Sequence, residues 1–138
     1  MRHLVQLAGL AEQVEIDSAG TCAYHVGEAP DARARATARN RGINVAGSAR
    51  KFARGDWRRF DYVLAMDRDN YRDLLSSAPA DAPGKQLFML RSFDPEAEKD
   101  APVPDPYYGG DRGFDVVLDQ CEKACRGLLA HIRREHGL

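Results

Sequence analysis

The sequence lacks the features that mark membrane and secreted proteins. It contains no apolar run long enough to span a bilayer and no signal-peptide pattern at its start. Cysteine is scarce, because Cys22, Cys121 and Cys125 are the only three, an odd number in a chain unlike a disulfide scaffold. These absences predict a cytoplasmic protein without a membrane contact. No repeat or low-complexity run divides the 138 residues, so we expect one domain, 1–138, with a buried core.

Motifs for metals and dinucleotides are missing too. His131 and His136 are five residues apart and lack the order of a helical zinc-protease site. The glycines between Gly109 and Gly113 have neither the spacing nor the preceding strand of a dinucleotide fingerprint. The sequence therefore predicts no metal and no cofactor.

Charge is balanced overall but uneven along the chain. The net charge is −1, yet residues 31–60 carry nine basic side chains and two acidic ones, a local charge of +7. Such a patch could steer an anionic partner, either a phosphorylated protein or nucleic acid, or it could be a solvated helix face with its loop. We expect no nucleic acid, because weak, strongly salt-dependent DNA binding is the least that such a module would show.

Hydrophobic periodicity predicts alternating helices and strands. Short apolar runs favour strands over residues 14–21, 61–67 and 87–90, and apolar stripes favour helices over residues 3–11, 31–40, 67–77 and 114–136. Residues 43–60 stay unassigned, with Trp57 and Phe60 as expected anchors. The alternation predicts an α/β domain whose parallel sheet is covered by helices on both faces.

The segment from residue 91 to residue 113 shows neither period. So long a loop is uncommon in a compact domain unless it has a function. Within it, Asp105 stands between Pro104 and Pro106 and is followed by Tyr107 and Tyr108. The prolines restrict the aspartate backbone, the aromatics could wall a pocket, and the acid could protonate a leaving oxygen, a role that partial burial favours. An ordinary Pro-rich surface turn is the other reading.

Five blocks of this sequence, in this order and spacing, resemble the low-molecular-weight protein tyrosine phosphatases. The similarity covers residues 2–134 and rests on the blocks at residues 17–21, 25–31, 49–50, 60–70 and 105–114. The resemblance implies a four-stranded parallel sheet flanked by helices, and a tyrosine-phosphorylated protein as substrate. It implies that Asp105 is the general acid, that Tyr107 and Tyr108 flank the phosphotyrosine ring, and that Ser18 and Asn44 brace the phosphate loop.

One departure from the family concerns the nucleophile. Family members carry a Cys-x5-Arg-Ser loop between their first strand and first helix, and its cysteine attacks phosphorus. Here the residues six positions after Cys22, Cys121 and Cys125 are glutamate, glycine and histidine. Cys121 and Cys125 share the apolar stripe of the last predicted helix, which favours core packing. The chain also begins inside a helix, although doubly wound sheets usually begin with a strand.

We therefore expect an N-terminally truncated domain without the first strand and the phosphate loop. A misassigned start, an engineered boundary and a genuine deletion are all compatible with the sequence. The expected gap beside the remaining strands predicts low stability and a possible dimer by strand exchange.

Three functions are compatible with these features. The first is a tyrosine phosphatase that works through a phosphocysteine intermediate in its full-length form. The second is a catalytically inactive protein that binds phosphoproteins or other partners. The third, an arsenate reductase, ranks below them because such enzymes relay oxidation through extra cysteines, and residues 68–90 contain none.

Overall fold

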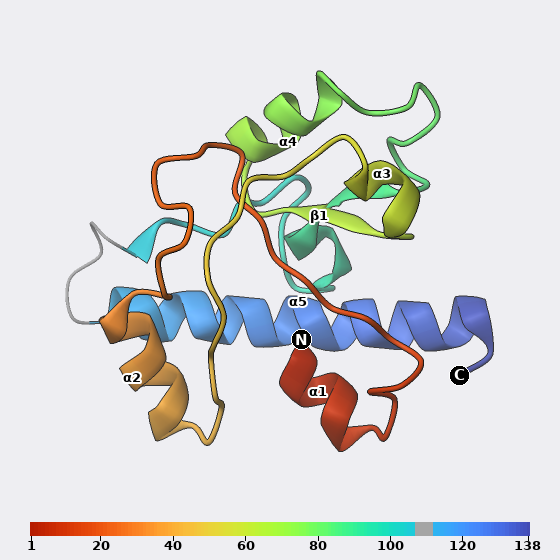
Figure 1. The fold of residues 1–138 in the computed structure, drawn as a ribbon. Helices are drawn as coiled ribbons and strands as arrows, with labels where there is room; N and C mark the ends of the chain where they lie inside the picture. Colours follow the sequence, from red (N-terminus) through yellow and green to blue (C-terminus); the bar gives the residue numbers. More distant parts are fainter. Residues whose placement is uncertain (107–111) are drawn as a thin grey trace.

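The structure is a computed structural model that describes residues 1–106 and 112–138 (Figure 1). Its elements follow one another along the chain as α1 (Arg2–Leu7), α2 (Ala32–Asn40), α3 (Asp56–Arg59), β1 (Val63–Ala65), α4 (Arg68–Leu75), β2 (Leu87–Met89), the 3-10 helix η1 (Leu90–Phe93) and α5 (Gly113–His136). Strands β1 and β2 pair in parallel, with Val63 beside Leu87 and Ala65 beside Met89. The predicted helices at 31–40, 67–77 and 114–136 and the strands at 61–67 and 87–90 are confirmed, with slightly shorter bounds.

Both faces of the sheet are covered. Side chains alternate along a strand, so Val63, Ala65, Leu87 and Met89 share one face and pack in a cluster with Trp57 and Leu74 from α3 and α4. Leu64 faces the other side and joins the cluster built on α5. Figure 1 shows α3 and α4 on one side of the strands and α5 on the other. The predicted α/β architecture is confirmed.

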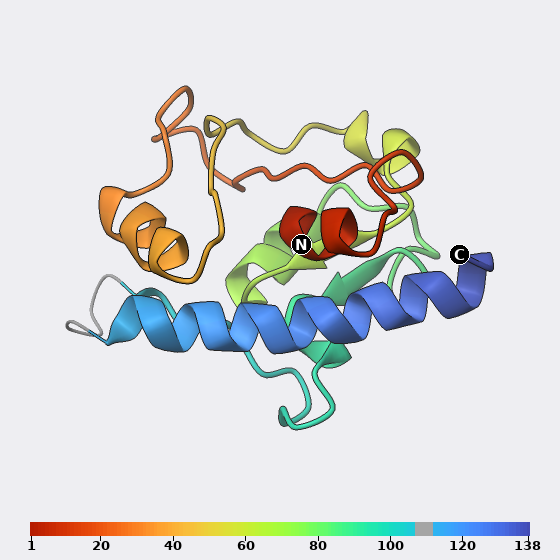
Figure 2. The same ribbon diagram turned by 90° about the horizontal axis from the view of Figure 1, so that it is seen from below.

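The ends of the helices follow local capping chemistry. Asp31 begins α2 by accepting a hydrogen bond from the Arg33 N–H at 2.8 Å, and Gly42, at φ 74°, follows its end in the left-handed conformation. The first helix is shorter than predicted, because Gly9, at φ 71°, stops it soon after Leu7. Figure 2 shows α1 beside the middle of α5 and α2 near its amino-terminal end.

The strand predicted at residues 14–21 does not form. This segment is extended, but its pairing is a single parallel bridge between Gly20 and Lys51. Residues 15–19 make no backbone–backbone hydrogen bond with any described residue. Alternating side chains are not sufficient for a strand, because a strand is defined by a neighbour that bonds to it. Two strands are hydrogen-bonded in the described residues, not the four that the resemblance implied.

Helix η1 lies unusually close to α5. A Cβ atom built on Gly127 of α5 would lie 1.8 Å from the carbonyl oxygen of Phe93. Only glycine at this position permits the approach, since any side chain would overlap the backbone of η1. The residue therefore fixes the distance between α5 and the end of β2.

Candidate active site

The Pro-rich loop is anchored at the carboxyl end of β1. The Val103 N–H donates a hydrogen bond to the carbonyl oxygen of Met66, the residue after β1, at 2.7 Å. Val103 is 6% exposed and belongs to the α5 cluster. Asp105 follows two residues later and is exposed, not partly buried as its proposed role favoured. Open parallel sheets commonly bind ligands at the carboxyl ends of their strands, and Asp105 belongs to the loop that is bonded to this edge.

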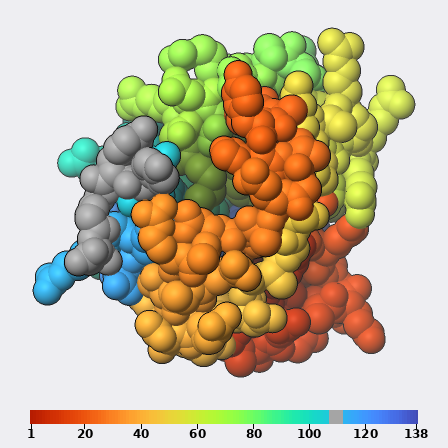
Figure 3. All heavy atoms as spheres, turned by 60° about the vertical axis from the view of Figure 1, so that its left-hand side comes forward, coloured from red at the N-terminus to blue at the C-terminus, as the bar shows by residue number. Residues whose placement is uncertain are grey.

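A second segment reaches the same edge. Asp67 caps α4 by accepting a hydrogen bond from the Asn70 N–H at 2.8 Å, and the Asn70 amide contacts the Thr21 hydroxyl at 3.4 Å. The loop after Thr21 carries Cys22, which is exposed, and Tyr24, which is 88% exposed. In Figure 3 the orange atoms of this part of the chain border a hollow with green atoms at its floor. The edge thus combines three segments that are distant in sequence.

The other predicted site residues are less well placed. Tyr107 and Tyr108 lie outside the described residues. Ser18 is exposed, and its backbone N–H donates to a carboxylate oxygen of Asp17 at 2.8 Å. Asn44 is exposed, and its side chain makes no hydrogen bond to a described residue. The structure places Asp105 in the loop bonded to this edge, and the roles of all five residues stay predictions.

A carboxylate–guanidinium network near Ser18 was not predicted. Arg50 donates to both carboxylate oxygens of Asp56, at 2.8 and 3.2 Å, and to Asp17 at 3.1 Å. Asp56 is 6% exposed and also accepts from the Ala53 N–H at 2.8 Å. The hydrogen bonds from Arg50 lower the pKa of Asp56, and the Ser18 N–H, followed by Arg50, lowers that of Asp17. The network joins residues 17–18 to the start of α3. In the sequence, Arg50 belonged to the basic segment and to the family block at residues 49–50, and Asp56 to the basic segment, but neither indicated this pairing.

Four of the nine basic side chains of that segment form ion pairs with described carboxylates. Its ion pairs join Arg33 to Asp31, Arg50 to Asp17 and Asp56, Arg59 to Glu15, and Arg41 to Asp115, Asp119 and Glu122. Arginines that are committed to intramolecular carboxylates contribute little to long-range steering. The structure favours a structural role for these four arginines.

The two cysteines of α5 are packing residues. Cys125 is buried, and Cys121 is half-buried in the same cluster. Burial, with a further effect of Cys125, raises the pKa of Cys121 to about 11. A nucleophilic thiol needs a lowered pKa, so the predicted core role of this pair is confirmed.

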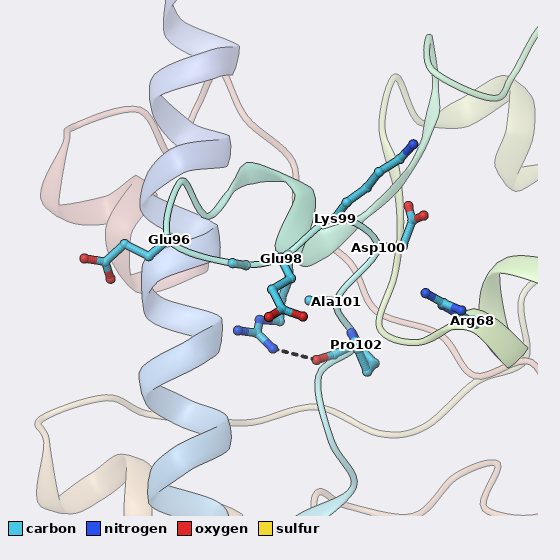
Figure 4. A pocket seen from close by; sticks show the side chains of 9 residues that line it. Arg68, Glu96, Glu98, Lys99, Asp100, Ala101 and Pro102 are labelled. Carbon is cyan, nitrogen blue, oxygen red and sulfur yellow. Dashed lines mark hydrogen bonds between the residues drawn. The ribbon is translucent and has the colours of Figure 1, made fainter.

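A shallow pocket of about 550 Å³ lies beside Arg68, between η1 and residues 96–102 (Figure 4). Arg91 donates from its guanidinium to the Pro102 carbonyl at 2.9 Å. Basic and acidic side chains are equally represented in the lining, and Glu96 points away from the pocket. The pocket consequently shows no preference for a ligand of one charge.

Among the described residues, no three His, Cys, Asp or Glu side chains cluster closely enough to hold a metal ion. Within the same residues, no helix has the length and apolar character that a membrane crossing requires.

Comparison with known proteins agrees with the fold. The family described as low molecular weight phosphotyrosine protein phosphatase matches residues 1–137. A putative low molecular weight protein-tyrosine-phosphatase of Synechocystis is 43% identical over 135 residues, which are 98% of this chain and 85% of that protein. The Streptomyces coelicolor low molecular weight protein-tyrosine-phosphatase is 42% identical, over 97% of this chain and 82% of its own.

A solved structure gives the same result. The protein tyrosine phosphatase of Entamoeba histolytica, crystallised with Hepes in its active site, superposes with a TM-score of 0.87 at 40% identity. The match covers 99% of this chain and 85% of the Entamoeba chain. This chain therefore belongs to the low molecular weight phosphotyrosine protein phosphatase family.

Proposed function

We propose that the protein hydrolyses phosphotyrosine monoesters on other proteins, with Asp105 as general acid. The observation that supports this most directly is the Val103–Met66 hydrogen bond, which fixes the Asp105 loop at the carboxyl end of β1. An exposed carboxyl group on a proline-restricted loop can approach the bridging oxygen of a substrate that lies over this edge. We further propose that Tyr107 and Tyr108 flank the substrate ring and that Ser18 and Asn44 support the phosphate loop.

The proposed reaction has two steps. A cysteine thiolate forms a bond to phosphorus while the phosphorus–oxygen bond to tyrosine breaks, and Asp105 gives its proton to the leaving oxygen. Water then attacks phosphorus, the sulfur–phosphorus bond breaks, and the Asp105 carboxylate takes a proton from the water as phosphate leaves. None of Cys22, Cys121 and Cys125 has an arginine six positions later, so we propose that the printed residues alone do not carry out this reaction.

The test is hydrolysis of p-nitrophenyl phosphate and of a phosphotyrosine peptide. The 138-residue chain would be assayed beside a chain extended by any encoded upstream segment with a Cys-x5-Arg-Ser loop. We expect turnover by the extended chain alone, and a loss of about 10²- to 10⁴-fold in kcat on the peptide for Asp105→Asn in that chain. Turnover by the short chain would contradict the proposal, and Cys22→Ser would then show whether Cys22 is the nucleophile. Phosphopeptide binding without turnover by the extended chain would favour the inactive binding protein.

We also propose that two copies of the 138-residue chain can associate by strand exchange. The supporting observation is that β1 pairs with β2 on one edge, while the extended residues 15–19 have no backbone partner among the described residues. Light scattering during gel filtration should then show a dimer whose fraction rises with concentration. A monomer at all concentrations with a cooperative mesophilic melting transition would contradict this.

A further inference from the structure

Gly113, the first residue of α5, makes a close contact with the residue after Asp105. A Cβ atom built on Gly113 would lie 2.9 Å from the carbonyl oxygen of Pro106 and 3.5 Å from its Cα atom. The first distance is too short for a carbon beside a backbone oxygen, so a side chain here would displace Pro106 or α5. Gly113 is not among the glycines with positive φ. Its lack of a side chain therefore provides space and not an unusual backbone conformation.

The contact is one of two anchors around Asp105. On the amino-terminal side, the buried Val103 is bonded to Met66 at 2.7 Å. On the carboxyl-terminal side, Pro106 lies against Gly113. Between these anchors stand only Pro104 and Asp105, and the rings of Pro104 and Pro106 fix φ at their own positions. A displacement at Pro106 consequently reaches Asp105 with little backbone freedom to absorb it.

We infer that Gly113 is a positioning residue for proton transfer by Asp105. The start of α5 lies against Pro106 because no side chain intervenes, and this contact sets the position of the Asp105 carboxyl group relative to the sheet edge. The inference rests on the proposed function, and it adds a residue that does not itself touch the substrate.

The kinetic experiment compares leaving groups in the extended chain described above. Phenyl phosphate has a strongly basic leaving group and needs a proton from the acid, whereas p-nitrophenyl phosphate needs much less assistance. Gly113→Ala should lower kcat/KM for phenyl phosphate by about 3- to 30-fold, because displacements below an ångström already cost reactivity. It should change kcat/KM for p-nitrophenyl phosphate by less than about twofold. The ratio kcat/KM is compared because it leaves out the hydrolysis of the phosphocysteine, which both substrates share.

The matched control is Gly55→Ala. Gly55 has φ −62° and no atom within 4 Å of a built Cβ, so alanine fits there without displacing anything. This variant should behave as wild type with both substrates. Alanine is also a better helix former than glycine, so Gly113→Ala should melt within about 3 °C of wild type, which separates a positioning effect from unfolding.

Three kinetic results would overturn the inference: equal losses of kcat/KM with both substrates, no loss with either, or the same loss in Gly55→Ala. Asp105→Asn is measured in parallel. If Asp105→Asn lowers kcat/KM equally for the two substrates, Asp105 is not the general acid, and the proposed function fails independently of Gly113. The effect of Gly113 on the position of Asp105 is then tested by NMR of the 138-residue chain. There, Gly113→Ala should shift the Asp105 amide resonance and Gly55→Ala should not, and an unshifted Asp105 amide in Gly113→Ala would overturn the inference.

Discussion

Residues 11–55 and residues 56–138 are held in place by different forces. In the first region Ala38 is the only buried residue, and ion pairs join this region to the rest of the molecule, from Arg41 to α5 and from Arg50 to Asp56. The second region contains almost all of the buried apolar side chains and the close approach of η1 to α5. Apolar packing is not weakened by electrostatic screening, whereas exposed ion pairs are screened by salt. The two regions should therefore respond differently to mutation, pH and ionic strength.

The largest effect is expected in the packed region, from Gly127→Ala. The new methyl group would lie 1.8 Å from the Phe93 carbonyl oxygen, so η1 and α5 must separate. We expect the free energy of unfolding to fall by about 3 kcal/mol, at the upper end of the range for overpacked cores. Urea denaturation measures the change, with Gly55→Ala as control. A midpoint shift no larger than that of Gly55→Ala would contradict the close approach.

A smaller effect is expected at the junction of the two regions, from Asp56→Asn. Removal of this buried carboxylate leaves Arg50 with Asp17 alone, and we expect a loss of about 2–3 kcal/mol in the free energy of unfolding. The pKa of Asp56 is lowered from 3.8, chiefly by hydrogen bonds from Arg50. Its contribution is therefore complete above the unfolded value and is lost as the pH falls through the lower folded value.

Urea denaturation at a series of pH values checks this sign. The wild-type protein should lose stability as the pH falls below about 4, and Asp56→Asn should lose less over the same interval. If the free energy of unfolding falls equally in the two proteins as the pH is lowered, protonation of Asp56 does not contribute to acid unfolding.

The smallest effect is expected in the ion-paired region, from Arg41→Met. Arg41 donates to Asp119 at 2.6 Å and to Asp115 at 3.1 Å, and these partners are exposed, so we expect a loss of stability smaller than that of Asp56→Asn. Hydrogen exchange of the α2 amides should become faster, and added salt should have the same effect on wild type. Arg39→Met is the matched control, because Arg39 lies on the same helix without an ion pair to a described residue. Equal exchange in both variants would show that Arg41 does not hold α2.

The sequence predicted the packed region better than the ion-paired one. The apolar runs around Val63 and Leu87 and the apolar stripe of α5 are local sequence patterns, so these elements were predicted correctly. The alternation at residues 14–21 predicted a strand that does not form, because strand pairing depends on a neighbour that the local pattern does not encode. The partners of Arg41 lie more than 70 residues away, and no spacing rule connects them.

In the candidate site, too, the sequence predicted features with a local signal and missed those that depend on distant segments. Asp105 was found because two prolines flank it, which is a local signal. The Arg50–Asp56 network and the spaces at Gly113 and Gly127 depend on which segments meet after folding. For Gly113 and Gly127 the one signal in the sequence was a glycine within or beside a helical pattern. That signal does not tell which other segment packs against the glycine.

The hydrogen bond between Val103 and Met66 uses main-chain atoms alone, which has a consequence for sequence variation at this edge. Any amino acid at position 66 presents the same acceptor, and its side chain is 39% exposed, so this position can change without releasing the loop. Position 103 must supply an N–H and a side chain that fits the α5 cluster, so proline is excluded there. A library that diversifies residue 66 can therefore alter the surface beside Asp105 while the attachment of the loop is retained.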